Sequence, residues 1–504
     1  MKKIVAILTI ITFFSFGCEK YLDEEPQGTY PVSTFFKTEE HALLAINSCY
    51  EPASFANSNN RLWVFADIAS DDAAKGGFPG DQADIELIDN FQVSEDNGNV
   101  QTIWAIYYNG ISRCNMVLKY VPDIDMDNAL KSRIIGEAYF LRGYYYFNLC
   151  NIFGNIPLIL KPLNPDEMQV PNTAQSDVYE QIESDFKKSF ENLEAAINLN
   201  PNVYPSSEIG RATPGAAKAL LAKTYLFEKK WSEAAETADE VKAYGYSLMD
   251  NYQHNFNVNY ENNKESIFEI QHLSGQNPIQ GNRLNQWLAP RNERGYGFDE
   301  PTQNFVDEFE VINDTIYDPR LDYTVGRAGK LWFDDVPYDP SWSSTGFSQK
   351  KYLQPDSETS SKGDGDLNFT VIRFAEILLI KAEALCELNR CQEALIPLNK
   401  VRKRARESYL YDTNLQGYGT IPIGLLPDIT TTDQVQLRNA IRHERRVELG
   451  FECQRYFDVI RYGEAYANNA FTDKVNFIYN RNKLFPIPQS EMATNLKLKQ
   501  NPGY

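Results

Sequence analysis

The fold is decided by residues 374–404, which read FAEILLIKAEALCELNRCQEALIPLNKVRKR. Ala382 and Leu385 are followed, across a short polar break at 387–390, by Ala394, Leu398 and Val401. Small residues at this spacing let two antiparallel helices approach closely, as in a tetratricopeptide hairpin. The stretch therefore predicts a helical hairpin.

The same pattern occurs earlier, in residues 214–246. Ala222 precedes Ala234 there by the same twelve positions that separate Ala382 from Ala394. One alanine-rich hairpin can arise by coincidence, but two in register favour a repeat. The segment 129–149 is interpreted as the start of another such unit. We predict a mostly α protein of stacked tetratricopeptide-like hairpins.

Two further helices are expected before these hairpins. Thr38 is a helix-start signal, and the apolar spacing of residues 100–120 predicts one buried helical face. The helix at 129–149 should stop at Gly154, which Pro157 follows.

Residues 274–366 differ from the rest of the chain. They contain nine Gly, seven Pro and three of the six Trp, with one short helical pattern at 301–311. This is too long for a plain connecting loop. We predict an inserted irregular lobe with short strands, between a helical body at 36–273 and its C-terminal part at 367–504.

The N-terminus has the features of an export signal. Lys2 and Lys3 precede the apolar run 4–16, which at thirteen residues is too short to cross a bilayer, and Gly17 precedes Cys18. Residues 1–17 are predicted to be a signal peptide, Cys18 the lipidation site and 18–35 a tether. Ser15 stands where lipoprotein signals usually have Leu, and an ordinary secretory signal is the alternative.

Charge and composition exclude several classes of protein. The net charge of −20 argues against binding nucleic acid, and weakly disfavours ligands rich in uronate or sulfate. Six dispersed cysteines besides Cys18 and four dispersed histidines give no zinc pattern. We predict no metal and no cofactor, and leave open a disulfide between Cys386 and Cys391.

Several motifs along the chain carry a family resemblance. They are IRHERRVELGFECQRYFDVIRYG at 441–463, LFPIPQ at 484–489, QNPGY at 500–504, EAYFLRGYYYF at 137–147, GNIPL at 154–158, DPRL at 318–321 and VIRFAEILLIKAEA at 371–384. Together they resemble the SusD/RagB family of surface glycan-binding lipoproteins. The resemblance implies an outer-membrane protein that captures glycan and delivers it to a TonB-dependent, SusC-like transporter.

The motif at 441–463 reads as one helix with an acidic stripe of Glu444, Glu448 and Glu452, followed by Arg455. Aligned carboxylates repel one another unless basic groups meet them. Candidates for that role are Arg373, Arg402, Arg404 and Arg406. A buried ion-pair network is favoured over a catalytic carboxylate cluster.

The family's ligand contacts vary with substrate, so the binding residues are predicted from composition alone. A sugar site pairs aromatic rings with a few fixed polar groups. The lobe offers Trp287, Tyr296, Trp332 and Trp342, with Arg291 and Asn292 as polar partners. The alternative for each tryptophan is that it anchors the lobe to the helical body.

A second nomination is the loop at 69–81, in which Asp71, Asp72 and Lys75 could bind sugar hydroxyls and Phe78 could stack. Asp71 and Asp72 could instead cap a helix or hold calcium.

Two other functions compete with glycan capture. Catalysis is disfavoured, because no nucleophile elbow, P-loop or metal-binding His pair is found. A tetratricopeptide-type scaffold that binds only protein is the second alternative.

Overall fold

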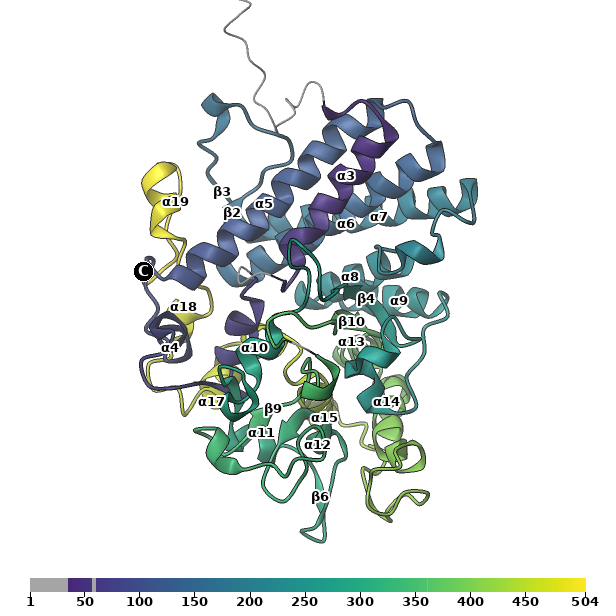
Figure 1. The fold of residues 1–504 in the computed structure, drawn as a ribbon, viewed down its shortest axis with the longest axis vertical. Coiled ribbons are helices and arrows are strands. Elements are labelled where there is room, and N and C mark those ends of the chain that lie inside the picture. The colour runs from purple at the N-terminus through teal and green to yellow at the C-terminus, as the bar shows by residue number, and fades with distance from the viewer. Residues whose placement is uncertain (1–34, 57–59, 360) are drawn as a thin grey trace, which may run out of the picture.

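A computed structural model describes residues 35–56, 60–359 and 361–504, and Figure 1 shows a mostly helical molecule. The predicted fold class is confirmed. Cys18, the signal peptide and nearly all of the tether lie outside the described residues. Within the described part of the chain, no helix is both long and apolar enough to cross a membrane.

Four helices form one end of the body, at the top of Figure 1: α3 (Glu39–Tyr50), α5 (Gly98–Tyr120), α6 (Asn128–Phe153) and α7 (Gln175–Leu199). Thr38 caps α3 as expected, since its hydroxyl accepts from the His41 amide at 3.3 Å. The predicted helices at 100–120 and 129–149 are α5 and α6. Gly154 ends α6 in the left-handed region, at a φ of 71°.

The two alanine-rich segments form hairpins, α8 (Pro214–Phe227) with α9 (Trp231–Lys242) and α13 (Phe374–Glu387) with α14 (Cys391–Tyr411). The four alanines of the repeat are fully buried. Helix α13 also packs against α9, so the hairpins stack on each other. The tetratricopeptide-like interpretation is confirmed. Cys386 and Cys391 are both free thiols.

The lobe is inserted between two neighbouring strands. The chain leaves the body through β4 (Ser266–Ile270) and returns through β10 (Phe369–Arg373), which pair antiparallel with Ile270 opposite Phe369. Between them lie α10 (Leu284–Leu288), β5 (Phe298–Pro301), α11 (Gln303–Asp307), β6 (Val311–Ile312), β7 (Ile316–Tyr317), α12 (Arg320–Thr324), β8 (Val325–Gly326) and β9 (Ser348–Gln349).

The other strands and α-helices are β1 (Ala73–Gly76), α4 (Ala83–Asp89), β2 (Ile156–Pro157), β3 (Asn172–Thr173), α15 (Gln434–Leu449), α16 (Arg455–Arg461), α17 (Glu464–Ala470), α18 (Tyr479–Asn482) and α19 (Gln489–Thr494). The prediction of one continuous helix across 441–463 is wrong, because α15 ends at Leu449 and α16 begins only at Arg455. A Cβ on Gly450 would lie 2.5 Å from the Phe305 ring, and Phe451 follows at a φ of 61°. Gly450 itself has a φ of −54°, so glycine is required here by the close Phe305 ring and not by a left-handed backbone.

Candidate functional site

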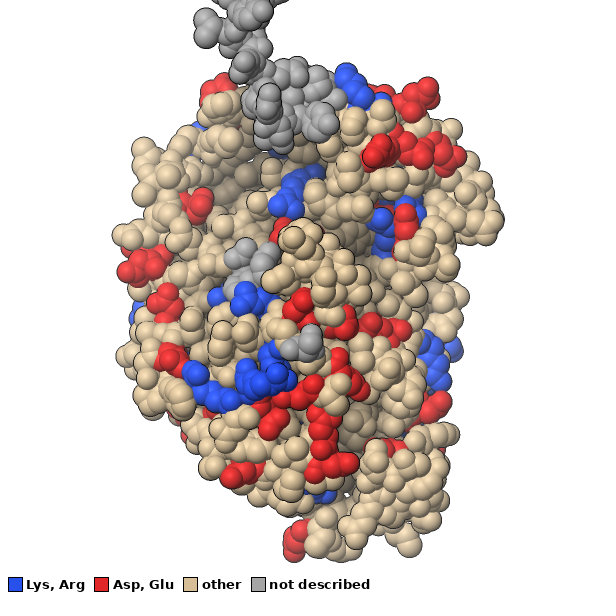
Figure 2. Space-filling model, in the orientation of Figure 1, with Lys and Arg blue, Asp and Glu red and all other residues tan. Residues whose placement is uncertain are grey.

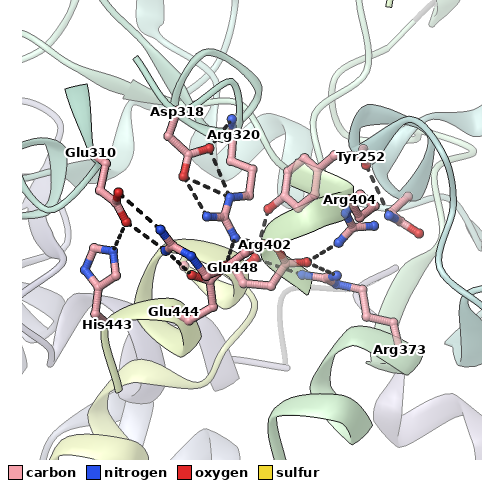
Figure 3. A network of polar contacts seen from close by, with 12 residues as sticks. Tyr252, Glu310, Asp318, Arg320, Arg373, Arg402, Arg404, His443, Glu444 and Glu448 are labelled. Carbon is pink, nitrogen blue, oxygen red and sulfur yellow. Dashed lines mark hydrogen bonds and ion pairs between the residues drawn. The ribbon is translucent and has the colours of Figure 1, made fainter. Parts of the chain in front are cut away.

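The acidic stripe of α15 lies inside a buried ion-pair network (Figure 3). Glu444 binds Arg320 at 2.6 Å and Arg402 at 2.9 Å. Glu448 binds Arg320 at 2.9 Å, Arg373 at 2.6 Å and also Arg404. Burial opposes ionisation, but these arginines hold the pKa of Glu448 well below its ordinary value.

Glu452 lies beyond α15 and completes the network. It binds Lys351 and Arg373, each at 2.8 Å. Of the predicted partners, only Arg406 lies elsewhere, paired with Asp428 at 2.8 Å. The ion-pair interpretation is confirmed, because carboxylates held by guanidinium groups in the core are structural.

The structure brings the two nominated regions together. Strand β1, from the 69–81 loop, pairs antiparallel with β5 of the lobe, with Ala73 opposite Pro301 and Gly76 opposite Phe298. The Gly77 amide donates to the Gly297 carbonyl at 2.6 Å. A Cβ on Gly76 would lie 2.4 Å from the same carbonyl, so this contact requires glycine.

Three polar residues of the loop do not face solvent. Asp71 accepts from Arg455 at 2.7 and 2.8 Å, and Asp72 accepts from Arg446 at 2.7 Å. Lys75 is buried, with its ammonium 3.2 Å from Glu86. Burial raises the pKa of Asp72 to about 6. Their interpretation as sugar-binding groups is corrected: these side chains tie the loop to the C-terminal helices and α4.

Two of the three lobe tryptophans are also core residues. Trp287 is 7% exposed and Trp332 is 5% exposed. The Trp287 ring packs against Trp63 and Phe298, with centroids 6.0 and 5.9 Å apart. The anchoring alternative therefore holds for Trp287, which contacts Trp63 of the body. Trp332 is instead buried within the lobe itself, against Tyr338 and Trp342. Trp342 is half-buried and packs edge-on against Tyr338 at 5.3 Å.

The accessible candidates lie at the junction of loop and lobe. Phe78 is 60% exposed, and the Arg291 guanidinium stacks 4.1 Å from the centre of its ring. Arg291 also forms an ion pair with Asp81. Asn292 is exposed, and Tyr296 is half-buried with its ring 5.3 Å from Trp287. Aromatic faces and polar groups thus occur together on one edge.

The sequence did not point to Arg61, whose guanidinium lies 4.2 Å from the centre of the Trp287 ring. Asp81, the partner of Arg291, was not singled out either. Neither position belongs to a local motif, because each acts through a residue more than 200 positions away.

Comparisons with known proteins agree with this architecture. A model of the SusD family matches residues 264–504, and one described as "Starch-binding associating with outer membrane" matches residues 20–226. "SusD-like protein P2" of Formosa agariphila is 28% identical, over 99% of this chain and 98% of its own.

Solved structures extend the likeness to the fold. One described as "Laminarin binding SusD-like protein" is 30% identical and covers 93% of this chain and 100% of its own, with a TM-score of 0.76. Surface glycan-binding protein A from Bacteroides thetaiotaomicron, in complex with laminarihexaose, is 25% identical and covers 92% and 100%, with a TM-score of 0.72. Because family models match residues 20–226 and 264–504 and a 30% identical solved relative is covered over its whole length, the chain belongs to the SusD family.

Proposed function

We propose that this chain is a cell-surface lipoprotein that binds oligosaccharide or polysaccharide. In this proposal Cys18 carries the lipid that anchors it to the outer membrane. The bound glycan then passes to a TonB-dependent, SusC-like transporter. The chemistry required is capture and release, with no covalent step.

The observation that carries the proposal is the surface at the junction of β1 and β5. Phe78 offers an aromatic face, Tyr296 a half-buried ring, and Arg291 and Asn292 supply hydrogen-bond donors beside them. Sugars present flat C–H faces rimmed by hydroxyls, which this combination suits. Trp342 is a further candidate contact, while Trp287 and Trp332 are buried and are not proposed to touch the ligand. Two similar structures are described as binding laminarin or laminarihexaose, which agrees with such a ligand.

Support for the membrane location comes from the family description, "associating with outer membrane". The transporter partner is proposed on the strength of the family resemblance alone. A groove of about 210 Å³ between the two hairpins, lined by Lys381, Arg390 and the 72% exposed Ile396 among others, offers a surface for protein contact. This groove also keeps the protein-only scaffold as the second candidate.

Affinity gels containing soluble polysaccharides test the proposal. The protein from Glu19 onward should be retarded by at least one polymer, and Phe78→Ala should reduce the retardation. Tyr418→Ala is the matched control, since Tyr418 is 51% exposed in the loop after α14. An unchanged polymer after incubation is expected for a binder. Retardation by no polymer would favour the scaffold, and shortened polymer would establish an enzyme.

A further inference from the structure

The loop between β2 and β3, residues 158–171, holds two apolar side chains in solvent. Met168 is 57% exposed and Leu160 is 41% exposed. A capping box closes the 3₁₀ turn Pro165–Glu167 directly before Met168. The Glu167 carboxylate also binds the Lys161 ammonium at 2.5 Å. Hydrogen bonds and an ion pair thus hold the turn that presents Met168.

Leu496, which is 83% exposed, lies beside this loop. Its amide donates to the side-chain oxygen of Gln169, the residue after Met168, at 2.9 Å. The Gln169 side-chain amide in turn donates to the carbonyl two positions before Leu496, at 2.8 Å. Residues 158–171 and 494–499 therefore form one continuous surface, which we call the shoulder surface.

The shoulder surface is less acidic than the molecule as a whole. Its two segments contain three lysines and two acids, namely Lys161, Lys497, Lys499, Asp166 and Glu167. The whole chain has 49 basic and 69 acidic residues. Figure 2 shows the upper left of the molecule, over the loop and α19, mostly in tan, whereas charged side chains gather near the centre of this face. The shoulder surface can therefore approach an anionic surface with little repulsion.

The start of the described chain lies close to the shoulder surface, because both contact α5. The Asn115 side chain donates to the Ile159 carbonyl at 2.9 Å, and the Tyr120 ring stacks on Phe36 with centroids 5.0 Å apart. Those two positions of α5 are five residues apart, a rise of about 7.5 Å along the helix. The start of α3 and the loop after β2 accordingly share the top of Figure 1.

We propose that the shoulder surface rests on the lipid bilayer, with Leu160, Met168 and Leu496 in the headgroup region and the lysines at lipid phosphates. The inference rests on the proposed anchoring through Cys18. An apolar cluster rimmed by lysine suits a membrane interface. Residues 19–34 can span at most about 55 Å, so the anchor would keep this end beside the bilayer and raise the effective concentration of a weak contact.

Such a contact would set the orientation of the molecule on the membrane. The lobe elements α10, α11, α12, β6 and β9 lie in the lower half of Figure 1, away from the shoulder surface at the upper left. The proposed glycan surface at the junction of β1 and β5 would therefore stand clear of the bilayer, where a polymer can reach it.

Site-specific fluorescence tests the membrane contact. The protein from Glu19 onward has six cysteines, all buried, so an added surface cysteine can be labelled by itself. Met168→Cys and Leu496→Cys carry a dye whose emission depends on polarity. Ile423→Cys is the matched control, since Ile423 is 99% exposed in the loop after α14. An N-terminal hexahistidine tag holds each protein on vesicles of phosphatidylethanolamine, phosphatidylglycerol and a nickel-chelating lipid.

On the vesicles, the dye at positions 168 and 496 should shift its emission to shorter wavelength and be quenched by spin-labelled lipid, with no change at position 423. Adding Leu496→Asp should remove the shift at position 168, because a carboxylate opposes entry into the interface; the substitution leaves the fold intact, since Leu496 is exposed.

Equal shifts at all three positions, or no shift at 168 and 496, would overturn the membrane contact. A shift that appears only after a transporter protein is added would assign the shoulder surface to protein and overturn it as well. Neither outcome bears on glycan retention in affinity gels, so the proposed function would stand. Absence of glycan retention with the shifts intact would refute glycan capture and leave the membrane contact standing.

Discussion

The carboxylate of Glu448 lies between three arginines, and Glu448→Gln would remove its charge while nearly keeping its shape. Arg320, Arg373 and Arg404 all donate to it, and all four side chains are buried. Each arginine retains another carboxylate in the variant, namely Asp318 for Arg320 and Glu265 for the other two. The cluster would nevertheless be left with an excess positive charge in the core.

Removing one partner of a buried ion pair typically costs about 3–5 kcal/mol, because the remaining charge stays desolvated. Because each arginine keeps a second carboxylate partner, we expect Glu448→Gln to lower the free energy of unfolding by about 3 kcal/mol, the lower end of this range. Equilibrium urea unfolding, monitored by tryptophan fluorescence, measures this loss as a lower midpoint at an unchanged slope.

Glu407→Gln serves as the matched control on α14. Glu407 forms an i,i+4 pair with the exposed Lys403 at 2.8 Å, and such pairs contribute about 0.3–0.5 kcal/mol. A loss below 1 kcal/mol in Glu448→Gln, or one equal to that of the control, would refute the reasoning that the buried network stabilises the fold.

Acid titration adds an independent check on the same residue. The folded-state pKa of Glu448 is depressed, so its contribution is present above the unfolded value of about 4.3 and is lost as pH falls below it. The wild-type protein should therefore lose more stability than Glu448→Gln between pH 5 and pH 3. Parallel curves would contradict the assignment.

Three further results are expected. Gly76→Ala should destabilise the pairing of β1 with β5 and weaken glycan retention, because the added Cβ would lie 2.4 Å from the Gly297 carbonyl oxygen. Gly80→Ala is the control, since the Cβ added there would meet no atom within 4 Å. Equal effects of the two substitutions would contradict a role for the β1–β5 junction in glycan retention. Asp67→Asn should flatten the fall in stability between about pH 4 and pH 8. Burial raises the pKa of Asp67 to about 8, so the stability that its protonated form contributes is lost as pH rises from the unfolded pKa to that value. An unchanged pH profile in the variant would exclude this. Cys18→Ser should abolish labelling by radioactive palmitate and release the protein from the membrane fraction, whereas continued labelling would place the lipid elsewhere.

The sequence was sufficient to predict which two regions of the chain form the candidate site, but not which of their residues are exposed. The loop at 69–81 and the lobe at 274–366 were both nominated, and β1 and β5 bring them together. Within those regions, composition could not separate the exposed Phe78 from the buried Trp287, because both are aromatic residues among mostly polar and small neighbours. Burial depends on which distant side chains cover a ring, and no local pattern records that.

The sequence by itself determined the helical hairpins, because the apolar and alanine spacing that forms a helix pair lies within about thirty consecutive residues. It also determined that the acids of α15 need basic partners. Only the tertiary structure decided which cations those are, including Arg320 and Lys351, and that Asp71 is held by Arg455 across 384 positions. It likewise placed Arg61 against Trp287. Helix formation follows from local periodicity, whereas ion pairs and ring contacts between distant segments depend on the folded path of the whole chain.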